Sequence, residues 1–237
     1  LRNVTLWFKV AGEMRVTEQH TSSPGSAQGL GLLPGFDPVG HLVTVEADHG
    51  WRAPSREQCL AWWDEYAMPA NIRRHSLLVA DIAVALARLA QARGVHVDVT
   101  AVEASALLHD LAKAYTIEHG GNHAHLGGAW VQALVHHPLV AQGVTHHVFW
   151  PWPVDVRAHF LTMAVIYADK RVMHDVVVTL DERYEDLQER YGATPRLRER
   201  IAWTHQQVRE IEEQFNRLLD VDIHARTFDS RGLVERT

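Results

Sequence analysis

Cysteine is nearly absent from the chain, and positive charge is not in excess. Cys59 is the single cysteine among 237 residues, so neither an internal disulfide nor a cysteine-rich zinc site is expected. Lys and Arg number 23 against 29 Asp and Glu, which gives a formal net charge of -6. This balance argues against a sequence-wide basic surface for DNA or an anionic membrane. We therefore expect neither partner, and an acidic substrate would require a local cluster of cations.

Long apolar segments are absent as well. The sequence contains no uninterrupted run of about 18 apolar residues, the length that indicates a transmembrane helix. Its first residues lack the charged, apolar and small-residue succession of a secretory signal. The composition, 46% hydrophobic and 22% charged residues, is that of a globular protein. We expect a cytoplasmic protein of one or two domains.

Histidine, by contrast, is abundant. The chain has 17 histidines among its 237 residues. Imidazole titrates near neutral pH and is the commonest metal ligand in proteins. The histidine content is therefore the first indication of a functional site.

Residues 1–52 differ in pattern from the rest of the chain. Ser, Gly and Pro cluster at 22–26 and 29–35 and interrupt every stretch that could form a helix. We expect an irregular N-terminal appendage, and nothing in it has the spacing of a catalytic motif.

From Ser55 onward the pattern is helical. Capping residues, apolar stripes and breaks at Gly and Pro predict helices at 55–68, 73–93, 100–115, 123–137, 139–148, 155–169 and 194–219. Thr100 and Glu103 form a capping-box pattern that would start the third helix. No multi-strand pattern follows residue 50. The predicted fold class is all-α, with a main domain at 53–178 and a C-terminal helical extension at 179–237 packed on it.

An adjacent histidine and aspartate carry the main chemical signal. His109 and Asp110 lie in an otherwise apolar segment, and would occupy the last full turn of the helix predicted at 100–115. Burying both side chains is costly unless something neutralises the carboxylate and orients the imidazole, and a metal ion does both. For the dipeptide alone, a buried hydrogen-bonded pair or a pair at an exposed helix end is the alternative interpretation.

Two further polar residues share this apolar setting. His75 lies near the start of the helix predicted at 73–93, and Asp169 ends an apolar helix. With His109 and Asp110 they supply two imidazoles and two carboxylates from three helices. Such a mixed nitrogen and oxygen set suits a divalent cation, for which Fe, Mn, Co, Ni, Zn and Mg are the candidates, and leaves coordination positions for water and substrate.

These residues resemble the H…HD…D signature of the HD superfamily of metal-dependent phosphohydrolases. The resemblance is carried by RHSLLVA around His75, ALLHDLAK around His109 and Asp110, and ADK around Asp169. The continuation ADKRVMHD, with VTLDERY after it, is similar to a largely uncharacterised bacterial branch of HD hydrolases. The resemblance covers roughly residues 70–175. It implies a compact helical bundle in which these four residues bind a first metal ion.

The resemblance also implies a second metal ion. His125 in HLGGA is similar to the HxxGA block of binuclear HD proteins, and His146 with His147 resembles the histidines that follow that block. Asp110 would bridge the two ions. Which of His146 and His147 points inward stays open, because helix neighbours differ in direction by about 100°. His123 is expected to face elsewhere.

Substrate-binding residues are expected around these metals. Lys113, one helical turn after Asp110, matches the family's lysine and would place an ammonium beside a phosphate. Lys170 and Arg183 are further cations, although Arg183 could instead solvate a C-terminal helical hairpin. Trp150 could stack on a nucleobase, although packing is the commoner role of such a residue.

The reaction implied by these parts is hydrolysis at phosphorus. One or two divalent cations would lower the pKa of a bound water and hold the phosphoryl oxygens, with Asp110 and Lys113 as catalytic residues. We expect an enzyme that hydrolyses a phosphoester or phosphoanhydride bond in a nucleotide or related small phosphorylated metabolite. A diadenosine-tetraphosphate-type dinucleoside polyphosphate hydrolase, oxygenation at a binuclear iron site, and a noncatalytic ligand-sensing HD domain are the alternatives. A homodimer is left open.

Overall fold

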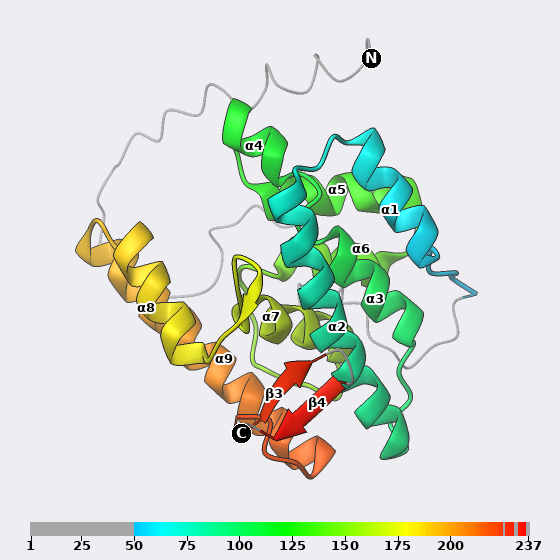
Figure 1. Ribbon diagram of the computed structural model, residues 1–237, viewed down its shortest axis with the longest axis vertical. Helices are drawn as coiled ribbons and strands as arrows, with labels where there is room; N and C mark the ends of the chain where they lie inside the picture. Colours follow the sequence, from blue (N-terminus) through cyan, green and yellow to red (C-terminus); the bar gives the residue numbers. More distant parts are fainter. Residues whose placement is uncertain (1–49, 225, 230–231, 236–237) are drawn as a thin grey trace, which may run out of the picture. The chain divides into compact units, whose positions relative to one another are not determined.

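The computed structural model describes residues 50–224, 226–229 and 232–235. Nearly all of the predicted N-terminal appendage lies outside these residues. Within the described part the chain is all-α, as predicted, with two short hairpins added (Figure 1). The helices are α1 (Arg56–Glu65), α2 (Ala70–Ala92), α3 (Val99–Leu108), α4 (Lys113–His119), α5 (His123–Val135), α6 (Pro138–His146), α7 (Phe160–Lys170), α8 (Leu180–Tyr191) and α9 (Pro195–Leu219).

Several helices begin where the sequence predicts. The Ser55 hydroxyl accepts the backbone N–H of Gln58, and the side-chain oxygen of Gln58 accepts the backbone N–H of Ser55. This capping box starts α1. Asn122 caps α5 by accepting two backbone N–H groups. Thr194 caps α9, and Pro195 occupies the first helical position, where its missing N–H costs nothing.

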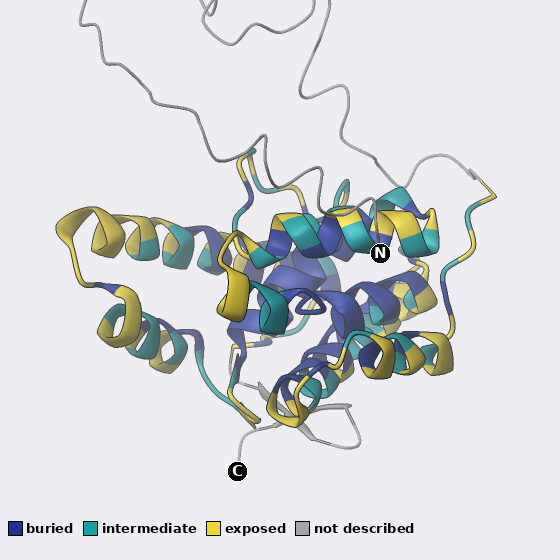
Figure 2. Ribbon diagram, turned by 90° about the horizontal axis from the view of Figure 1, so that it is seen from above, coloured by how far each residue is buried: buried dark blue, intermediate teal, exposed yellow. Residues whose placement is uncertain are grey.

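The most buried helix, α7, forms the centre of the domain. Every residue of Phe160–Lys170 is buried. Around α7 pack α2, α3, α6 and α9, and Figure 2 shows the buried residues gathered in these central helices. The helices α8 and α9 form a hairpin at the left of Figure 1, with largely exposed outer faces in Figure 2. On α9, Phe215 packs edge-on against Phe160, with 5.3 Å between ring centroids. The last two residues of α7 are polar, and their burial needs a chemical explanation.

The helix predicted at 100–115 is wrong in its boundaries. Asp98, not Thr100, caps α3 by accepting the N–H of Ala101 at 3.0 Å. Glu103 is not part of a capping box, because its carboxylate pairs with Arg56 at 2.6 Å. The helix ends at Leu108, residues 109–112 form a turn, and α4 starts a new helix. His109 and Asp110 therefore project from a turn between two helices rather than from a continuous helix.

Two other helix ends differ from the prediction. The helix predicted at 123–137 ends at Val135, because His136 adopts a left-handed conformation with φ of 52°. Pro138 does not merely end that helix, since it occupies the first turn of α6. Asp155 caps a separate turn by accepting the N–H groups of Arg157 and Ala158, and α7 begins only after it.

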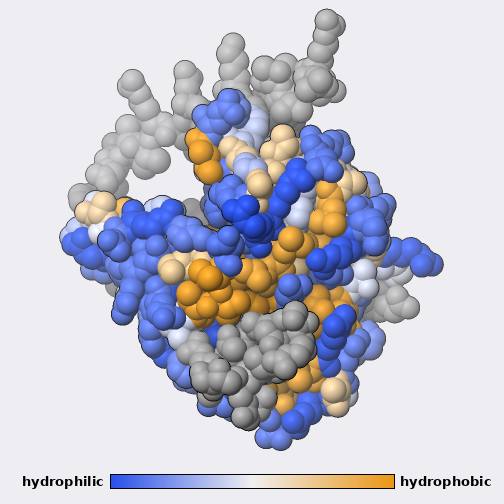
Figure 3. Space-filling model, viewed as in Figure 1, coloured by the Kyte–Doolittle hydropathy of each residue, from blue (hydrophilic) through white to orange (hydrophobic). Residues whose placement is uncertain are grey.

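Two antiparallel hairpins accompany the helices. In the first, β1 (Val172–Met173) pairs with β2 (Val176–Val177), and this hairpin joins α7 to α8. In the second, β3 (Arg226–Asp229) pairs with β4 (Gly232–Glu235). Figure 3 shows an apolar area in the middle of the face on which Figure 1 draws the first hairpin. Val176 in this hairpin is 53% exposed. Neither hairpin changes the fold class.

One described helix, α2, is long and apolar enough to cross a membrane by length and composition alone. Half of its most apolar stretch is buried inside the protein. Asp81 and Arg88 interrupt the helix, which is consistent with the absence of an unbroken apolar run. A core helix of a helical domain meets the same criterion, and α2 packs against both α3 and α7.

Candidate metal centre

Histidine and aspartate side chains from separate parts of the chain converge at one end of α7. The possible ligand atoms of His75, His109 and Asp110 all lie within 4.8 Å of one another, and so do those of Asp110, His123 and His147. Atoms that bind one ion at about 2.0–2.2 Å lie within about 4.4 Å of each other, so both spacings are close to those of a metal site. Asp110 belongs to both groups. We refer to the residues of the two groups, together with the neighbouring Asp169, as the centre.

Asp169 closes the first group. Its Oδ1 lies 3.0 Å from Nε2 of His75 and 3.8 Å from Nε2 of His109. His109, Asp110 and His147 are at most 1% exposed, while His75 and Asp169 are 7% and 6% exposed. Buried charged and titratable groups require partners. The four residues predicted to hold a first metal are therefore together, and they are almost fully removed from solvent.

Three of the imidazoles are oriented in the same way. Nδ1 of His109 donates to the carbonyl of Ala106, and Nδ1 of His147 donates to the carbonyl of Val144, both at 2.7 Å. Nδ1 of His75 donates to the carbonyl of His174 at 3.1 Å. Because a carbonyl only accepts, each Nδ1 carries the proton, and in the neutral ring Nε2 presents its lone pair. This arrangement is typical of metal-ligating histidines.

Two atoms at the centre lack a hydrogen-bond partner within the described part of the chain. They are Nε2 of His109 and Oδ1 of Asp110, both buried. An unsatisfied buried polar atom costs roughly 1–3 kcal/mol, and more when the group is charged. Nε2 of His75 also faces the carboxylate of Asp169, an arrangement of two acceptors that needs a proton or a cation between them. A divalent cation would satisfy all of these atoms, so the residues present fit a metal ion.

Two lysines hold the carboxylates. Nζ of Lys113 lies 2.7 Å from Oδ2 of Asp110, and Nζ of Lys170 donates to Oδ2 of Asp169. Burial raises the pKa of both aspartates, but the positive charges of His109 and Lys113 on Asp110, and of Lys170 on Asp169, hold each pKa well below its usual value. Both carboxylates are therefore in the ionised form that binds a cation.

The imidazoles respond to the same surroundings. Burial, and then the nearby charge of His109, hold the pKa of His147 well below its usual value. Burial also lowers the pKa of His123, although the carboxylate of Asp110 opposes the shift. For His109, burial lowers the pKa, but the adjacent Asp110 more than offsets it and the pKa is raised. Neutral rings are the metal-binding form, which suits His123 and His147.

The structure places His123, rather than His125, at the centre. Nε2 of His123 lies 3.4 Å from Oδ1 of Asp110 and 3.2 Å from Nε2 of His147. The side chain of His125 is exposed. Side chains two residues apart on a helix point in directions that differ by about 200°. Only one of His123 and His125 can therefore face the centre. The expectations that His125 is a ligand and that His123 faces elsewhere do not match this geometry.

The open choice between His146 and His147 is also resolved. His147 lies at the centre, with Nε2 at 3.7 Å from Oδ1 of Asp110. The ring of His146 instead packs edge-on against Trp150 and Trp152, with centroids 5.6 and 5.1 Å away. His146 is therefore a packing residue, and its predicted role as a ligand is not supported.

The predicted substrate-binding residues divide into two kinds. Lys113 and Lys170 lie at the centre, and Arg183 lies close enough for its charge to act on Lys113. Trp150 does not line an open site, because its side chain is fully buried and its indole N–H donates to the carbonyl of Pro153 at 3.0 Å. The expectation that Trp150 stacks on a nucleobase is thus corrected to core packing.

His123 is the residue that the sequence analysis missed. Asn122 caps α5, so His123 is the first helical residue, and this position directs its side chain back across the centre. The cap at Asn122 is the sequence signal that favours His123, whereas the motif HLGGA favours His125.

Comparison of the chain with protein-family models, curated proteins and solved structures gives no match. The helical architecture and the buried His/Asp centre are compatible with an HD-type domain. A functional proposal for this chain therefore rests on the residues of the His/Asp centre.

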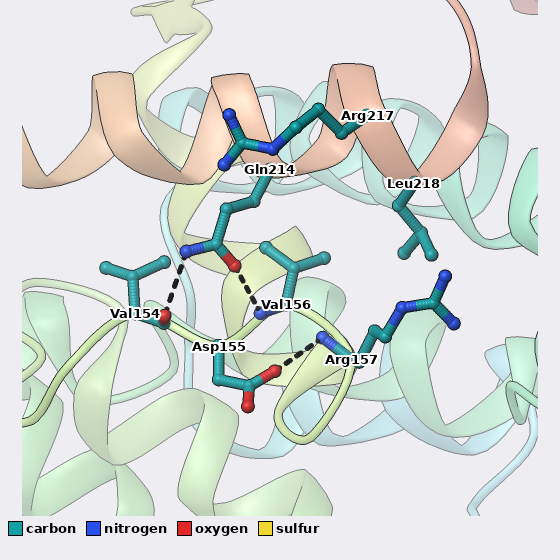
Figure 4. A pocket seen from close by; sticks show the side chains of 7 residues that line it. All are labelled: Val154, Asp155, Val156, Arg157, Gln214, Arg217 and Leu218. Atoms are coloured by element: carbon teal, nitrogen blue, oxygen red, sulfur yellow. Dashed lines mark hydrogen bonds between the residues drawn. The ribbon is translucent and has the colours of Figure 1, made fainter.

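The pocket in Figure 4 lies elsewhere, between α9 and the segment that precedes α7. The amide of Gln214 bridges Val154 and Val156 there, accepting from the Val156 N–H at 3.1 Å and donating to the Val154 carbonyl at 2.9 Å (Figure 4). None of the seven lining residues belongs to the His/Asp centre. This hollow is a packing feature of the α9 contact, separate from the His/Asp centre at the end of α7.

Proposed function

We propose that the chain is a metal-dependent hydrolase of phosphoester or phosphoanhydride bonds in a nucleotide or related small phosphorylated metabolite. The observation that carries this proposal is the position of Asp110. Its Oδ1 faces His123 and His147, its Oδ2 is held by Lys113, and it belongs to both groups of ligand atoms. A single carboxylate shared in this way is suited to two adjacent cations.

The ligand sets follow from the two groups. His75, His109, Asp110 and Asp169 would hold one divalent cation, and Asp110, His123 and His147 would hold a second. Oxygen and nitrogen ligands without cysteine suit Mn, Fe, Co, Ni, Zn or Mg. Such cations supply Lewis acidity and lower the pKa of a bound water.

The protein's own residues supply position and charge. Lys113 is the cation that remains partly accessible at the centre, with a side chain 37% exposed, whereas the side chain of Lys170 is 9% exposed. Its ammonium can donate to a phosphoryl oxygen as charge develops there. Lys170 keeps Asp169 ionised and donates to the carbonyl of His147, so it positions ligands rather than substrate.

The types of ligand at the centre favour catalysis over a purely structural metal site. Structural zinc sites prefer closed, cysteine-rich tetrahedral sets, and Cys59 is not among the clustered residues. A ligand-sensing domain without activity has no need of Lys113 beside the shared carboxylate. This cation therefore favours the enzyme over the sensor.

Elemental analysis combined with a phosphate-release screen tests the proposal. The full chain, purified without chelator or histidine tag, is assayed for bound metals and then for phosphate release from nucleotides and dinucleoside polyphosphates, with each of the six metals restored in turn. We expect about two ions per chain and release from at least one substrate. If the chain binds one ion and releases phosphate, only the first ligand set holds a metal. If it binds no metal and releases no phosphate, the proposal is overturned.

A further inference from the structure

Helix α8 returns the chain to the metal centre. Asp169 is the last residue but one of α7, the hairpin β1–β2 follows, and α8 packs back against α7. Tyr184 on α8 is 2% exposed. Burial and the nearby negative charge of Asp169 raise the pKa of its phenol. The inner face of α8 is thus part of the surroundings of the centre, although no residue of α8 belongs to the two ligand groups.

Arg183, the residue before Tyr184, has a hydrogen-bond acceptor for one part of its guanidinium but not for its Nε. Its side chain is 13% exposed, and its Nη1 donates to Asp186 at 2.8 Å. Its Nε is buried and has no hydrogen-bond acceptor among residues 50–224. A buried N–H of a charged group without an acceptor is costly, so a group that supplies an acceptor there is stabilised.

The charge of Arg183 also acts on Lys113, the accessible lysine of the centre. Burial and the positive charge of Arg183 lower the pKa of Lys113. The negative charges of Asp110 and Asp169 outweigh them and raise this pKa. Two cations from different helices therefore lie close enough for their charges to interact. A guanidinium offers several N–H donors in a fixed plane, whereas an ammonium is a point charge, so the two cations suit different oxygens of an extended anion.

We propose that Arg183 is a specificity-determining residue that binds the second of two adjacent phosphate groups while Lys113 binds the first. The site then prefers substrates that carry a diphosphate unit over those that carry a single phosphate. This inference rests on the proposed function, since it assigns the substrate class of the same centre. Asp186 is a positioning residue in this arrangement, because it holds one edge of the guanidinium and leaves Nε for the anion.

Binding of two non-hydrolysable anions tests the assignment without relying on turnover. Isothermal titration calorimetry on the full, Mn²⁺-loaded chain compares methylenediphosphonate with methylphosphonate. The same titrations are made on Arg183→Gln and Arg183→Lys. Arg190→Gln is the matched control, because Arg190 lies on the same helix and contacts the same Asp186, at 3.6 Å, but its side chain is 46% exposed. Metal content is measured before and after each titration, so that stripping of Mn²⁺ by the diphosphonate is detected.

We expect the wild-type chain and Arg190→Gln to bind the diphosphonate about tenfold more tightly than the monophosphonate, as one added hydrogen bond to a charged group provides. Arg183→Gln should lose this preference while its metal content and its affinity for methylphosphonate stay within about twofold, and Arg183→Lys should keep part of the preference. A full preference in Arg183→Gln, or none in the metal-loaded wild type, overturns this inference and leaves the proposed function standing. A wild-type chain that takes up no metal removes both.

Discussion

Asp110 and Lys113 form an ion pair in which Nζ lies 2.7 Å from Oδ2, while Oδ1 of the same carboxylate has no hydrogen-bond partner in the part of the chain described. The turn between α3 and α4 produces this asymmetry, because it separates the two residues by three positions and directs both toward the centre. One oxygen is neutralised by the protein, and the other faces His123 and His147. The carboxylate is thus prepared for a cation on the histidine side.

Asp110→Asn removes the charge of this carboxylate and keeps its shape. We expect bound metal to fall below one ion per chain and any phosphate release to fall at least about a hundredfold, because even indirect partners of metal ligands cost about 10–100-fold. Circular dichroism should show unchanged helix content. Asp175→Asn is the matched control, since Asp175 pairs with Arg74 at 3.1 Å at an exposed position. Full metal content in Asp110→Asn would remove Asp110 from the centre.

Lys113→Met separates charge from metal binding. The methionine side chain fills similar space but provides no donor, so turnover should fall about 10²–10³-fold, as it does when one oxyanion-stabilising donor is lost. Metal content should remain at the wild-type level, because Lys113 contacts a ligand but is not one. Elemental analysis and single-turnover kinetics on the same preparation measure both quantities. Loss of metal in parallel with activity would assign Lys113 a structural role.

Much of the centre could be predicted because polar residues in apolar segments are conspicuous. His75, His109, Asp110 and Asp169 are flanked by apolar residues that form the core, and burial forces such residues to find partners. Their convergence needs only that the helices pack together, which their apolar faces require.

The second half of the centre could not be predicted in the same way. Whether His123 or His125 faces inward depends on where α5 starts and how it is rotated against α6, and sequence spacing allows either. The same holds for His146 and His147. Trp150 also shows the limit, since an aromatic residue in a Pro-rich connection can line a pocket or fill the core, and only the packing decides.

The paired variants His123→Ala and His125→Ala test this rotation directly. His123→Ala should lose the second ion and leave about one per chain, because the set around His75 is untouched. His125→Ala should keep the wild-type metal content, since His125 is exposed. Metal analysis of the two proteins, prepared side by side, distinguishes the assignments. The reverse pattern would show that α5 presents its other face to the centre.

Cys59 provides a single internal probe of the core. Its side chain is fully buried, and burial, with the charge of Glu103 added, raises the pKa of the thiol to about 12. At about pH 8, where a free thiol is partly ionised, we expect no alkylation by iodoacetamide in the native chain and complete alkylation in denaturant. Mass spectrometry of the intact protein measures the modification. Rapid labelling of the native chain would contradict the packing of α1 against α3.

The metal-free centre should make stability depend on pH. The pKa of His147 is lower in the folded chain than the usual value of about 6.5, chiefly because of burial. Unfolding therefore allows the ring to take up a proton, so its contribution to stability is present above about pH 6.5 and is lost as the pH falls below that value. The aspartates have depressed pKa values, so their contribution persists to lower pH and is lost only below about pH 4.

Urea unfolding in the presence of a chelator, repeated at intervals from about pH 7.5 to 5, measures this dependence. The raised pKa of His109 opposes this dependence, so the two proteins are compared directly. As the pH is lowered, the free energy of unfolding should decrease more steeply in the wild type than in His147→Gln, because glutamine does not titrate. His125→Gln, at an exposed position, should keep the wild-type slope. If His147→Gln and the wild type have equal slopes, the imidazole of His147 is not buried in its neutral form, and the orientation of its ring toward Asp110 would have to be abandoned.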